Sequence, residues 1–146
     1  MICVRSLANR VTWQTVTMDV VLRFNVGQKP PQVWLAEAEK VIELFSRQPG
    51  FIAAKASLSL DEDHLAMLYL EFENVGAYRR ALSAYDIKLE ATLFLSNALD
   101  EPSAYEVLLQ KRDGVVQKYE SEKTSSSLEI ALGDSATARA ESRLEQ

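Results

Sequence analysis

The chain has 146 residues, of which 47% are apolar, and a formal net charge of −5 at pH 7. This length and composition suit one globular domain with a substantial hydrophobic core. The negative charge argues against a nucleic-acid partner, and no apolar run approaches the roughly 18 residues of a membrane span. Cys3 is the one cysteine, so no internal disulfide can form, which favours a reducing compartment such as the cytoplasm.

The first 16 residues are predicted to be a poorly structured leader. Arg5 and Arg10 occur there without an acidic residue, a composition compatible with a mitochondrial transit peptide, but the compact apolar centre of a secretory signal is missing. Translation from Met18 is a further alternative, because Met18 directly precedes the first predicted strand. A chain that begins there would lose nothing that we assign to the core.

The next elements in chain order are a strand, a helix and a pair of strands. Residues 17–26 are rich in β-branched and aromatic side chains and end at Gly27, which indicates a strand. A helix follows from the Pro30-Pro31 step to Pro49-Gly50, with apolar residues at helical spacing. Residues 51–60 alternate in polarity, and residues 65–72 follow after a short acidic turn, so the two strands pair antiparallel. In the first of them, the side chains predicted to face one way are Ile52, Ala54, Ala56, Leu58 and Leu60.

A second helical segment and a last strand complete the domain. Asn74 is a good N-cap, and Asp86 can cap a further helical stretch. The apolar stripe predicted for this segment comprises Tyr78, Ala81, Leu82, Tyr85, Ile87, Ala91, Phe94, Leu95 and Ala98. Residues 104–110 are the last predicted strand. The order βαββαβ predicts an α+β, ferredoxin-like fold, with a four-stranded antiparallel sheet and both helices on one face.

The C-terminal residues differ in composition from the rest. Residues 111–146 are rich in Ser, Glu and Lys, which is typical of a linker or a disordered tail. Val115, Val116 and Tyr119 could still form a short strand or an arm on a partner. We therefore expect three segments: a leader at 1–16, a folded domain at 17–110 and a tail or dimer arm at 111–146.

A sheet with helices on one face leaves its other face bare. By alternation this bare face would carry Val21, Phe51, Ala53, Met67 and Tyr69, along with Arg23, Lys55, Ser57 and Glu71. So large an apolar share favours association, and two sheets that pair about a two-fold axis would bury it. We expect a homodimer through the sheet faces. The charged residues Asp19, Arg23, Lys55 and Glu71 would then form ion pairs at the rim or have a functional role.

Three short motifs resemble the antibiotic biosynthesis monooxygenase family over residues 18–110. They are the Pro-Gly-Phe step at 49–51, the Phe72-Glu73-Asn74 exit into a helix that contains Tyr78, and the DEPS-x-YEV run at 100–107. The resemblance implies a dimeric α/β barrel with a pocket between the helices and the sheet of each subunit.

The residues whose positions in the helical and strand repeats would turn them toward this pocket are Phe24, Trp34, Phe72, Tyr78, Leu82 and Phe94. Aromatic residues at such spacing are also typical of an ordinary hydrophobic core. Tyr78 is the candidate catalytic residue, because a buried phenol needs a partner and can donate or accept a proton. Trp34 likewise has an indole N–H to satisfy, and Arg79 or Arg80 could lie at the mouth.

The resembled family includes two activities that can be compared with the residues of this chain. Haem degradation needs a histidine ligand in the second helical region, but residues 75–99 contain none, and His64 lies beside the hairpin turn. Cofactor-free members oxidise phenols with electrons that the substrate supplies. The resemblance thus implies a cofactor-independent monooxygenase for a small aromatic or quinol, with no cofactor and no metal site. The alternative is a non-catalytic dimer that binds a small molecule or another protein.

Overall fold

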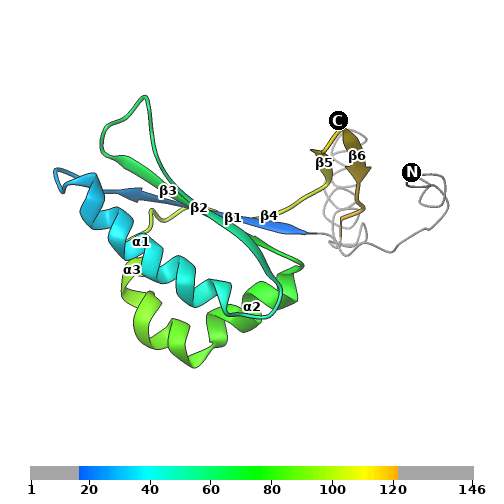
Figure 1. Ribbon diagram of the computed structural model, residues 1–146, viewed down its shortest axis with the longest axis horizontal. Helices are drawn as coiled ribbons and strands as arrows, with labels where there is room; N and C mark the ends of the chain where they lie inside the picture. The colour runs from blue at the N-terminus through cyan, green and yellow to red at the C-terminus, as the bar shows by residue number, and fades with distance from the viewer. Residues whose placement is uncertain (1–16, 122–146) are drawn as a thin grey trace, which may run out of the picture. The chain divides into compact units, whose positions relative to one another are not determined.

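The computed structural model describes residues 17–121, so the predictions for 1–16 and 122–146 lie outside the described residues. The chain forms two units that divide between Val107 and Leu108. The elements of the first unit are β1 (Met18–Asn25), α1 (Pro31–Ser46), β2 (Phe51–Leu58), β3 (Leu65–Phe72), α2 (Val75–Ser83), the π-helix η2 (Ile87–Ala91), α3 (Thr92–Ser96) and β4 (Ala104–Glu106) (Figure 1).

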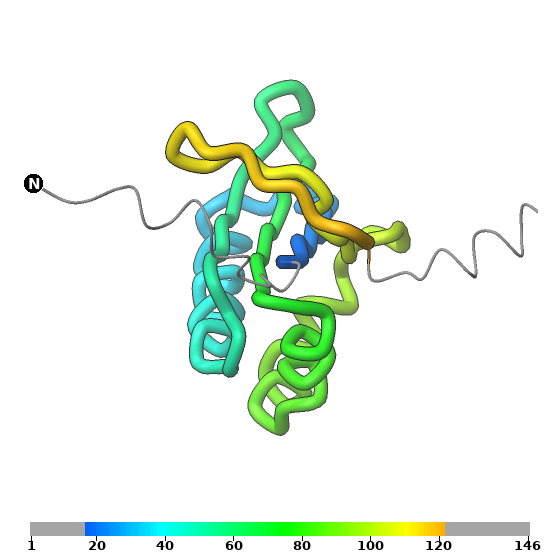
Figure 2. Tube along the Cα trace, turned by 90° about the vertical axis from the view of Figure 1, so that its right-hand side faces the viewer, coloured from blue at the N-terminus to red at the C-terminus, as the bar shows by residue number. Residues whose placement is uncertain are grey.

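The four strands of this unit form one antiparallel sheet in the order β2-β3-β1-β4. Figure 1 shows the helices together on one face of the sheet, and Figure 2 shows α1 beside the α2–α3 segment. This architecture confirms the predicted ferredoxin-like α+β fold with its βαββαβ order. The central strands β1 and β3 pair over their full length, from Met18 opposite Phe72 to Asn25 opposite Leu65.

The hydrophobic core lies between the sheet and the helices. Alternate residues of the central strands point into it, since successive side chains of a strand face opposite ways. The core residues with no exposed surface at all are Val20, Ala38, Phe45, Leu68, Leu70, Phe72 and Ala91. The interior of this layer is therefore shielded from water along the middle of the sheet.

Phe51 is on the core face, so its predicted position on the bare face is wrong. Phe51 pairs with Phe72, whereas Ala53 pairs with the preceding residue of β3, so Ile52 is one extra residue in the ladder. Such a β-bulge shifts the alternation of side chains by one. The Phe51 ring consequently packs edge-on against Phe72 at 5.8 Å, and Ile52 is 40% exposed.

The second helical segment begins as predicted and then breaks. The Asn74 Oδ1 atom accepts a hydrogen bond from the Ala77 N–H at 2.8 Å, which confirms the N-cap. Ala84 leaves the helical conformation with ψ 142°, and η2 starts a new turn three residues later. The predicted stripe is wrong for Leu82, which lies in α2 before the break, and for Tyr85, which follows it; they are 37% and 80% exposed. Further along, the predicted inward residues Ile87, Ala91 and Phe94 are buried.

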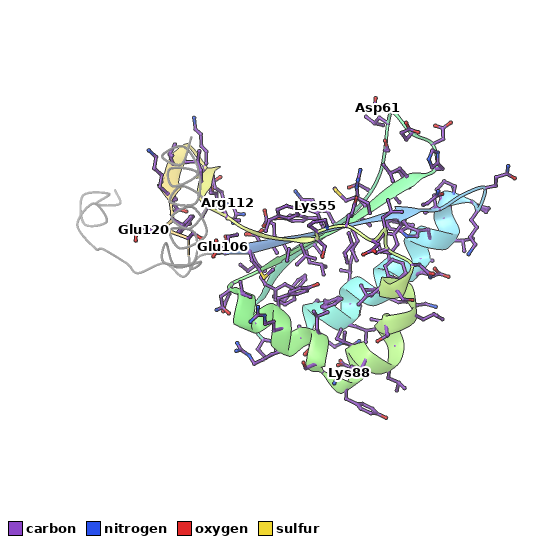
Figure 3. The ribbon with its side chains drawn as sticks, turned by 180° about the vertical axis from the view of Figure 1, so that it is seen from behind. Lys55, Asp61, Lys88, Glu106, Arg112 and Glu120 are labelled. Carbon is purple, nitrogen blue, oxygen red and sulfur yellow. The ribbon has the colours of Figure 1, made fainter. Side chains whose placement is uncertain are left out.

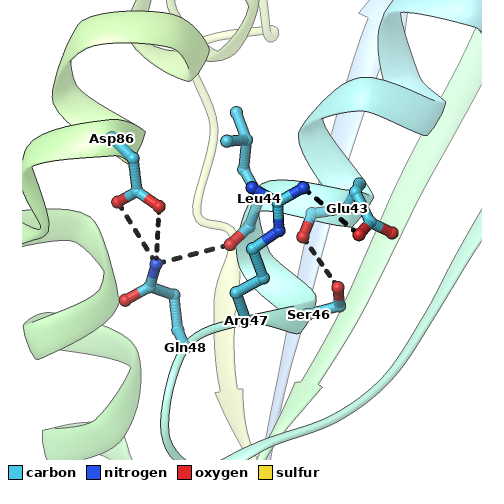
Figure 4. A network of polar contacts seen from close by, with 6 residues as sticks. All are labelled: Glu43, Leu44, Ser46, Arg47, Gln48 and Asp86. Carbon is cyan, nitrogen blue, oxygen red and sulfur yellow. Dashed lines mark hydrogen bonds and ion pairs between the residues drawn. The ribbon is translucent and has the colours of Figure 1, made fainter.

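Gln48 ties the end of α1 to the start of η2. Its Nε2 donates to the two carboxylate oxygens of Asp86 at 3.2 and 3.1 Å and approaches the Leu44 carbonyl oxygen at 3.4 Å (Figure 4). Asp86 in turn accepts from the Ile87 N–H at 2.9 Å. One carboxylate thus both caps η2 and holds the neighbouring helix, which fixes the spacing of the helical layer after the break at Ala84.

The second unit is a hairpin of β5 (Leu109–Arg112) and β6 (Val115–Lys118). Its two turn residues, Asp113 and Gly114, both have positive φ, of 52° and 78°, as a type I′ turn requires. The predicted strand at 104–110 is interrupted in the structure: β4 ends at Glu106, and β5 starts at Leu109. The strand expected of Val115 and Val116 is present as β6.

Candidate functional site

Three aromatic rings from three elements pack together at one end of the core. Phe24 comes from β1, Trp34 from α1 and Phe94 from α3, and their exposed fractions are 2%, 6% and 9%. The ring centroids are 5.6 Å apart for Phe24 and Trp34, 4.8 Å for Phe24 and Phe94, and 6.0 Å for Trp34 and Phe94. The structure thus brings together three of the six predicted pocket residues, which we call the Trp34 cluster.

A cavity of about 210 Å³ lies beside the Trp34 cluster and is called the Trp34 cavity below. It is lined by Phe24, Asn25, Val26, Lys29, Val33, Trp34, Glu37, Phe94 and Asn97. Its volume is below the roughly 300–1,000 Å³ of sites for drug-sized ligands, but above that of an apolar cavity of about 150 Å³ that binds benzene. The Trp34 cavity therefore suits a molecule with one aromatic ring better than a fused polycyclic one.

The rim of the Trp34 cavity is a tight turn. The Lys29 N–H donates to the Val26 carbonyl oxygen at 3.2 Å, and Gly27 within the turn has φ +58°. The Gly27 N–H donates to Asn25 Oδ1 at 2.9 Å, and two prolines then restrict the chain before α1. These local constraints place the Lys29 backbone at the rim before any ligand binds.

Trp34 carries an unsatisfied donor. Its Nε1 is buried and makes no hydrogen bond to any residue in the described part of the chain. A buried donor without an acceptor costs about 1–3 kcal/mol. The neighbouring Phe24 and Phe94 rings have no lone pair to accept this hydrogen. Trp34 also lines the cavity, and an acceptor atom within reach of Nε1 would relieve this cost.

Tyr78 belongs to a different aromatic group. Its ring lies 5.4 Å from that of Phe72, which also packs against Phe45 and Phe51. The Tyr78 side chain is partly buried, and burial raises the pKa of its phenol. Its hydroxyl makes no hydrogen bond to another residue within 17–121. The phenol is therefore protonated at neutral pH, when it can donate a hydrogen bond but cannot act as a base.

The two aromatic groups lie at opposite ends of the sheet. Phe72 is opposite Met18, six residues before Phe24 along β1, and six residues of strand span roughly 20 Å. Neither Phe72 nor Tyr78 lines the Trp34 cavity. Leu82, the sixth predicted residue, is 37% exposed on α2. The six predicted residues therefore do not form one pocket in this chain.

The charged residues at the rim of the Trp34 cavity were not among the predictions. Arg79 and Arg80, the expected residues for a pocket mouth, are exposed on α2 and do not line the cavity. Lys29 and Glu37 line it instead. A signal for Lys29 was present in the sequence, because it stands between Gly27 and the two prolines, where a turn must connect β1 to α1.

Solved structures resemble this chain in fold. SnoaB, a cofactor-independent oxygenase from Streptomyces nogalater, is 21% identical and has a TM-score of 0.55, with 67% of this chain and 97% of that chain covered. A candidate antibiotic biosynthesis monooxygenase from Bordetella bronchiseptica is 15% identical with a TM-score of 0.53, and the coverage is 66% and 98%. This chain has an antibiotic biosynthesis monooxygenase-like fold.

The monooxygenase-like fold confirms the resemblance that the Pro-Gly-Phe step and the exit from β3 indicated. A conserved protein from Methanosarcina mazei Go1 has it too, at 19% identity and a TM-score of 0.52, with 63% of this chain and 93% of that chain covered. Neither protein-family models nor curated proteins match the sequence. At such identities the likeness concerns the fold alone.

The bare sheet face of this monooxygenase-like fold carries its own polar contacts. The Arg23 guanidinium donates to both carboxylate oxygens of Glu101, a partner that the sequence did not suggest. This pairing raises the pKa of Arg23 and lowers that of Glu101. The Tyr69 hydroxyl donates to Asp19 Oδ1 at 2.9 Å, and burial together with this bond raises the pKa of Tyr69. Lys55 Nζ lies 5.7 Å from the centre of the Tyr69 ring.

Residues 17–121 contain no cluster of three or more His, Cys, Asp or Glu side chains that could hold a metal ion. His64 is half exposed, and its Nδ1 lies 3.7 Å from a carboxylate oxygen of Glu62. Over the same range, no helix has the length and apolar character needed to cross a membrane.

Proposed function

We propose that the protein is a cofactor-independent oxygenase that acts on a single-ring phenol or quinol bound in the Trp34 cavity. The observation that carries the proposal is the cavity itself, which lies between helices and sheet and is bordered by three aromatic rings. Its volume limits the substrate to about one ring. The similarity of the fold to that of a cofactor-independent oxygenase supports the same proposed function.

The proposed reaction needs no electron source besides the substrate. One phenol and one O2 give one quinone and one water, so an oxygen atom enters the ring and the other leaves as water. The electrons that reduce O2 come from the ring. The protein has to hold the ring, exclude water and stabilise the oxygen substituent as it gains negative charge. Trp34 lines the cavity and has a buried Nε1 without an acceptor, and we assign this last role to it.

Oxygen uptake tests the proposal. We expect uptake with hydroquinone or catechol and none above background with a three-ring phenol, because the cavity is too small for the latter. Val33→Trp should abolish uptake, since Val33 lines the cavity and a larger side chain would fill it. Leu89→Trp is the matched control, because Leu89 is 66% exposed and does not line the cavity. Equal uptake by both variants would contradict the proposal.

A non-catalytic small-molecule-binding protein is the second candidate. One observation favours it: the titratable residues that line the cavity, Lys29 and Glu37, are both exposed, so the cavity has no buried acid or base. Saturable binding of hydroquinone without any oxygen uptake would support this alternative over the oxygenase.

We also propose that a second copy of the chain covers the bare sheet face and that the protein is cytoplasmic. Val21, Met67 and Tyr69 are only half buried on this face, and Lys55 projects from the side opposite the helices (Figure 3). Two such faces paired about a two-fold axis would remove this apolar surface from water. The cytoplasmic location is supported by the single cysteine, which leaves no internal disulfide.

A further inference from the structure

The two edges of the four-stranded sheet differ in the part of the chain that the structure describes. On the β4 side, the loop before β4 covers the edge of β1. The Val21 N–H donates to the Ser103 carbonyl oxygen at 2.7 Å. The Leu99 N–H donates to the Arg23 carbonyl oxygen, also at 2.7 Å. β2 forms the other edge and pairs on one side only, with β3. An open edge strand is a template to which another extended segment can add.

The backbone groups on the open side of β2 belong to Ala54, Ala56 and Leu58, which we call the edge residues. The Ser59 N–H donates to the Leu65 carbonyl oxygen at 2.9 Å, so these two residues are a hydrogen-bonded pair of the β2–β3 ladder. Hydrogen-bonded pairs alternate along antiparallel strands. The edge residues therefore point their N–H and C=O groups away from β3, and nothing within residues 17–121 forms a hydrogen bond with them on that side.

An apolar groove of about 310 Å³ lies beside this edge, between β2 and the first turns of α1. Its lining residues are Pro31, Gln32, Trp34, Leu35, Ala56, Ser57 and Leu58. Leu35 and Leu58 are 50% and 45% exposed. Successive side chains of a strand point to opposite faces of a sheet. Every second side chain of a strand added to β2 would therefore meet this groove.

The opposite face of the same edge carries a positive charge. Lys55 is exposed there and projects away from the helices (Figure 3). A lysine on an edge strand discourages pairing with other strands, whereas opposite charges on neighbouring strands stabilise a pair. The strand that fits β2 should therefore have apolar side chains at alternate positions, toward the groove, and an acidic side chain between them.

Residues 128–132 of this chain, with the sequence LEIAL, have this pattern. Leu128, Ile130 and Leu132 alternate with Glu129 and Ala131. The three apolar side chains match the groove, and Glu129 matches the face that carries Lys55. The segment lies outside the described residues, and its assignment to β2 rests on this match of polarity and charge.

We propose that residues 128–132 of a second copy of the chain add to β2 as a further strand of its sheet. The inference rests on the proposed dimer but not on the oxidation chemistry. Leu128, Ile130 and Leu132 fill the groove, and Glu129 pairs with Lys55. Two-fold symmetry makes the exchange reciprocal, so the open edge of each copy is covered by the other.

Amide hydrogen exchange of the full chain, followed by NMR at the edge residues, tests the added strand. We expect their amides to exchange about tenfold more slowly in the unmodified protein than in Ile130→Asp. Leu144→Asp is the matched control, because Leu144 lies in the same tail outside the segment. Its edge amides should exchange like those of the unmodified protein. Equal exchange in the unmodified protein and in Ile130→Asp would overturn the inference.

A mixed disulfide tests whether the segment comes from the other copy. Chains with Lys55→Cys are mixed with chains with Glu129→Cys, both also with Cys3→Ser, and oxidised mildly. We expect a disulfide between the two kinds of chain, and much less when Glu141→Cys replaces Glu129→Cys, since Glu141 lies outside the segment. Equal yields for the two tail positions would contradict the proposed pairing.

Light scattering distinguishes this inference from the proposed sheet-face dimer. A dimer whose edge amides exchange as fast as in Ile130→Asp would refute the added strand and keep the sheet-face dimer. A monomer with slowly exchanging edge amides would refute the exchange between copies together with the dimer. Oxygen uptake is measured separately, so neither result depends on turnover.

Discussion

The Phe72 and Tyr78 rings pack with their centroids 5.4 Å apart, at the end of the core opposite the Trp34 cavity. Tyr78 therefore has the burial expected of a catalytic phenol but does not line the Trp34 cavity. Its raised pKa follows from burial, without a charged partner. The sequence suggested that the buried phenol would lie in the ligand pocket, but in the structure the phenol and the Trp34 cavity are apart.

Tyr78→Phe should leave both folding and oxygen uptake nearly unchanged. The hydroxyl makes no hydrogen bond within the described chain, so its removal should alter the free energy of unfolding by less than about 1 kcal/mol. Urea unfolding and uptake assays measure the two effects. If uptake fell roughly 10²-fold while the unfolding curve stayed the same, Tyr78 would take part in proton transfer. The reaction would then take place near Phe72 and Tyr78 rather than in the Trp34 cavity.

Two substitutions of Trp34 should have very different effects on stability. Trp34→Ala removes a buried ring and should lower the free energy of unfolding by about 3–5 kcal/mol. Trp34→Phe keeps an aromatic ring and removes the orphan donor, so the net change should be about 1 kcal/mol or less. Urea unfolding of both variants checks this. A loss with Trp34→Phe as large as with Trp34→Ala would show that Nε1 has a partner that stabilises the native protein.

Gly50 links the end of α1 to β2, and its replacement tests this connection. Gly50 has φ +87°, and a Cβ at this position would lie 2.5 Å from the Ala77 Cβ atom. Gly50→Ala should therefore destabilise the protein by about 2–4 kcal/mol, from the backbone conformation and the clash together. Gly27→Ala is the control, since Gly27 also has positive φ but no atom within 4 Å. Its expected cost is about 1 kcal/mol, and equal costs would contradict the close packing of Gly50 on α2.

A charge on the bare sheet face should separate the proposed dimer. Met67 lies on this face opposite Arg23 and Ser57. Met67→Asp would replace an apolar side chain of the proposed interface with a carboxylate that is costly to remove from water, so light scattering should report a monomer for the variant and a dimer for the unmodified protein. Leu89→Asp on the exposed side of η2 should remain a dimer. An unmodified protein that is monomeric at micromolar concentration would refute the proposal.

Most of the fold could be predicted from local signals that are strong on their own. Asn74 caps α2, the prolines start α1, and Pro49-Gly50 ends it, each for a reason contained in a few residues. The departures arise where tertiary contacts decide. The bulge at Ile52 reverses Phe51 because Phe51 packs against Phe72, and no pattern in β2 alone signals an extra residue.

The site was only partly predictable for the same reason. Phe24, Trp34 and Phe94 have the right phase to face the core, and the structure brings them together. Periodicity alone cannot tell which end of the sheet an aromatic side chain occupies, so Phe72 and Tyr78 were grouped with them. Leu82 was assigned inward together with Ala81, but α2 buries Ala77 and Ala81, and Leu82, one position further round the same helix, is 37% exposed.

The Trp34 Nε1–H resonance in a two-dimensional ¹H–¹⁵N spectrum provides the most direct test of the central claim, that a small aromatic occupies the Trp34 cavity. The sequence has two tryptophans, and Trp34→Phe assigns the Trp34 signal by its loss. During anaerobic titration with hydroquinone, this signal should shift downfield and saturate as the orphan donor gains an acceptor. A Trp34 signal that stays in place while the Tyr78 and Phe72 amides shift would contradict the account.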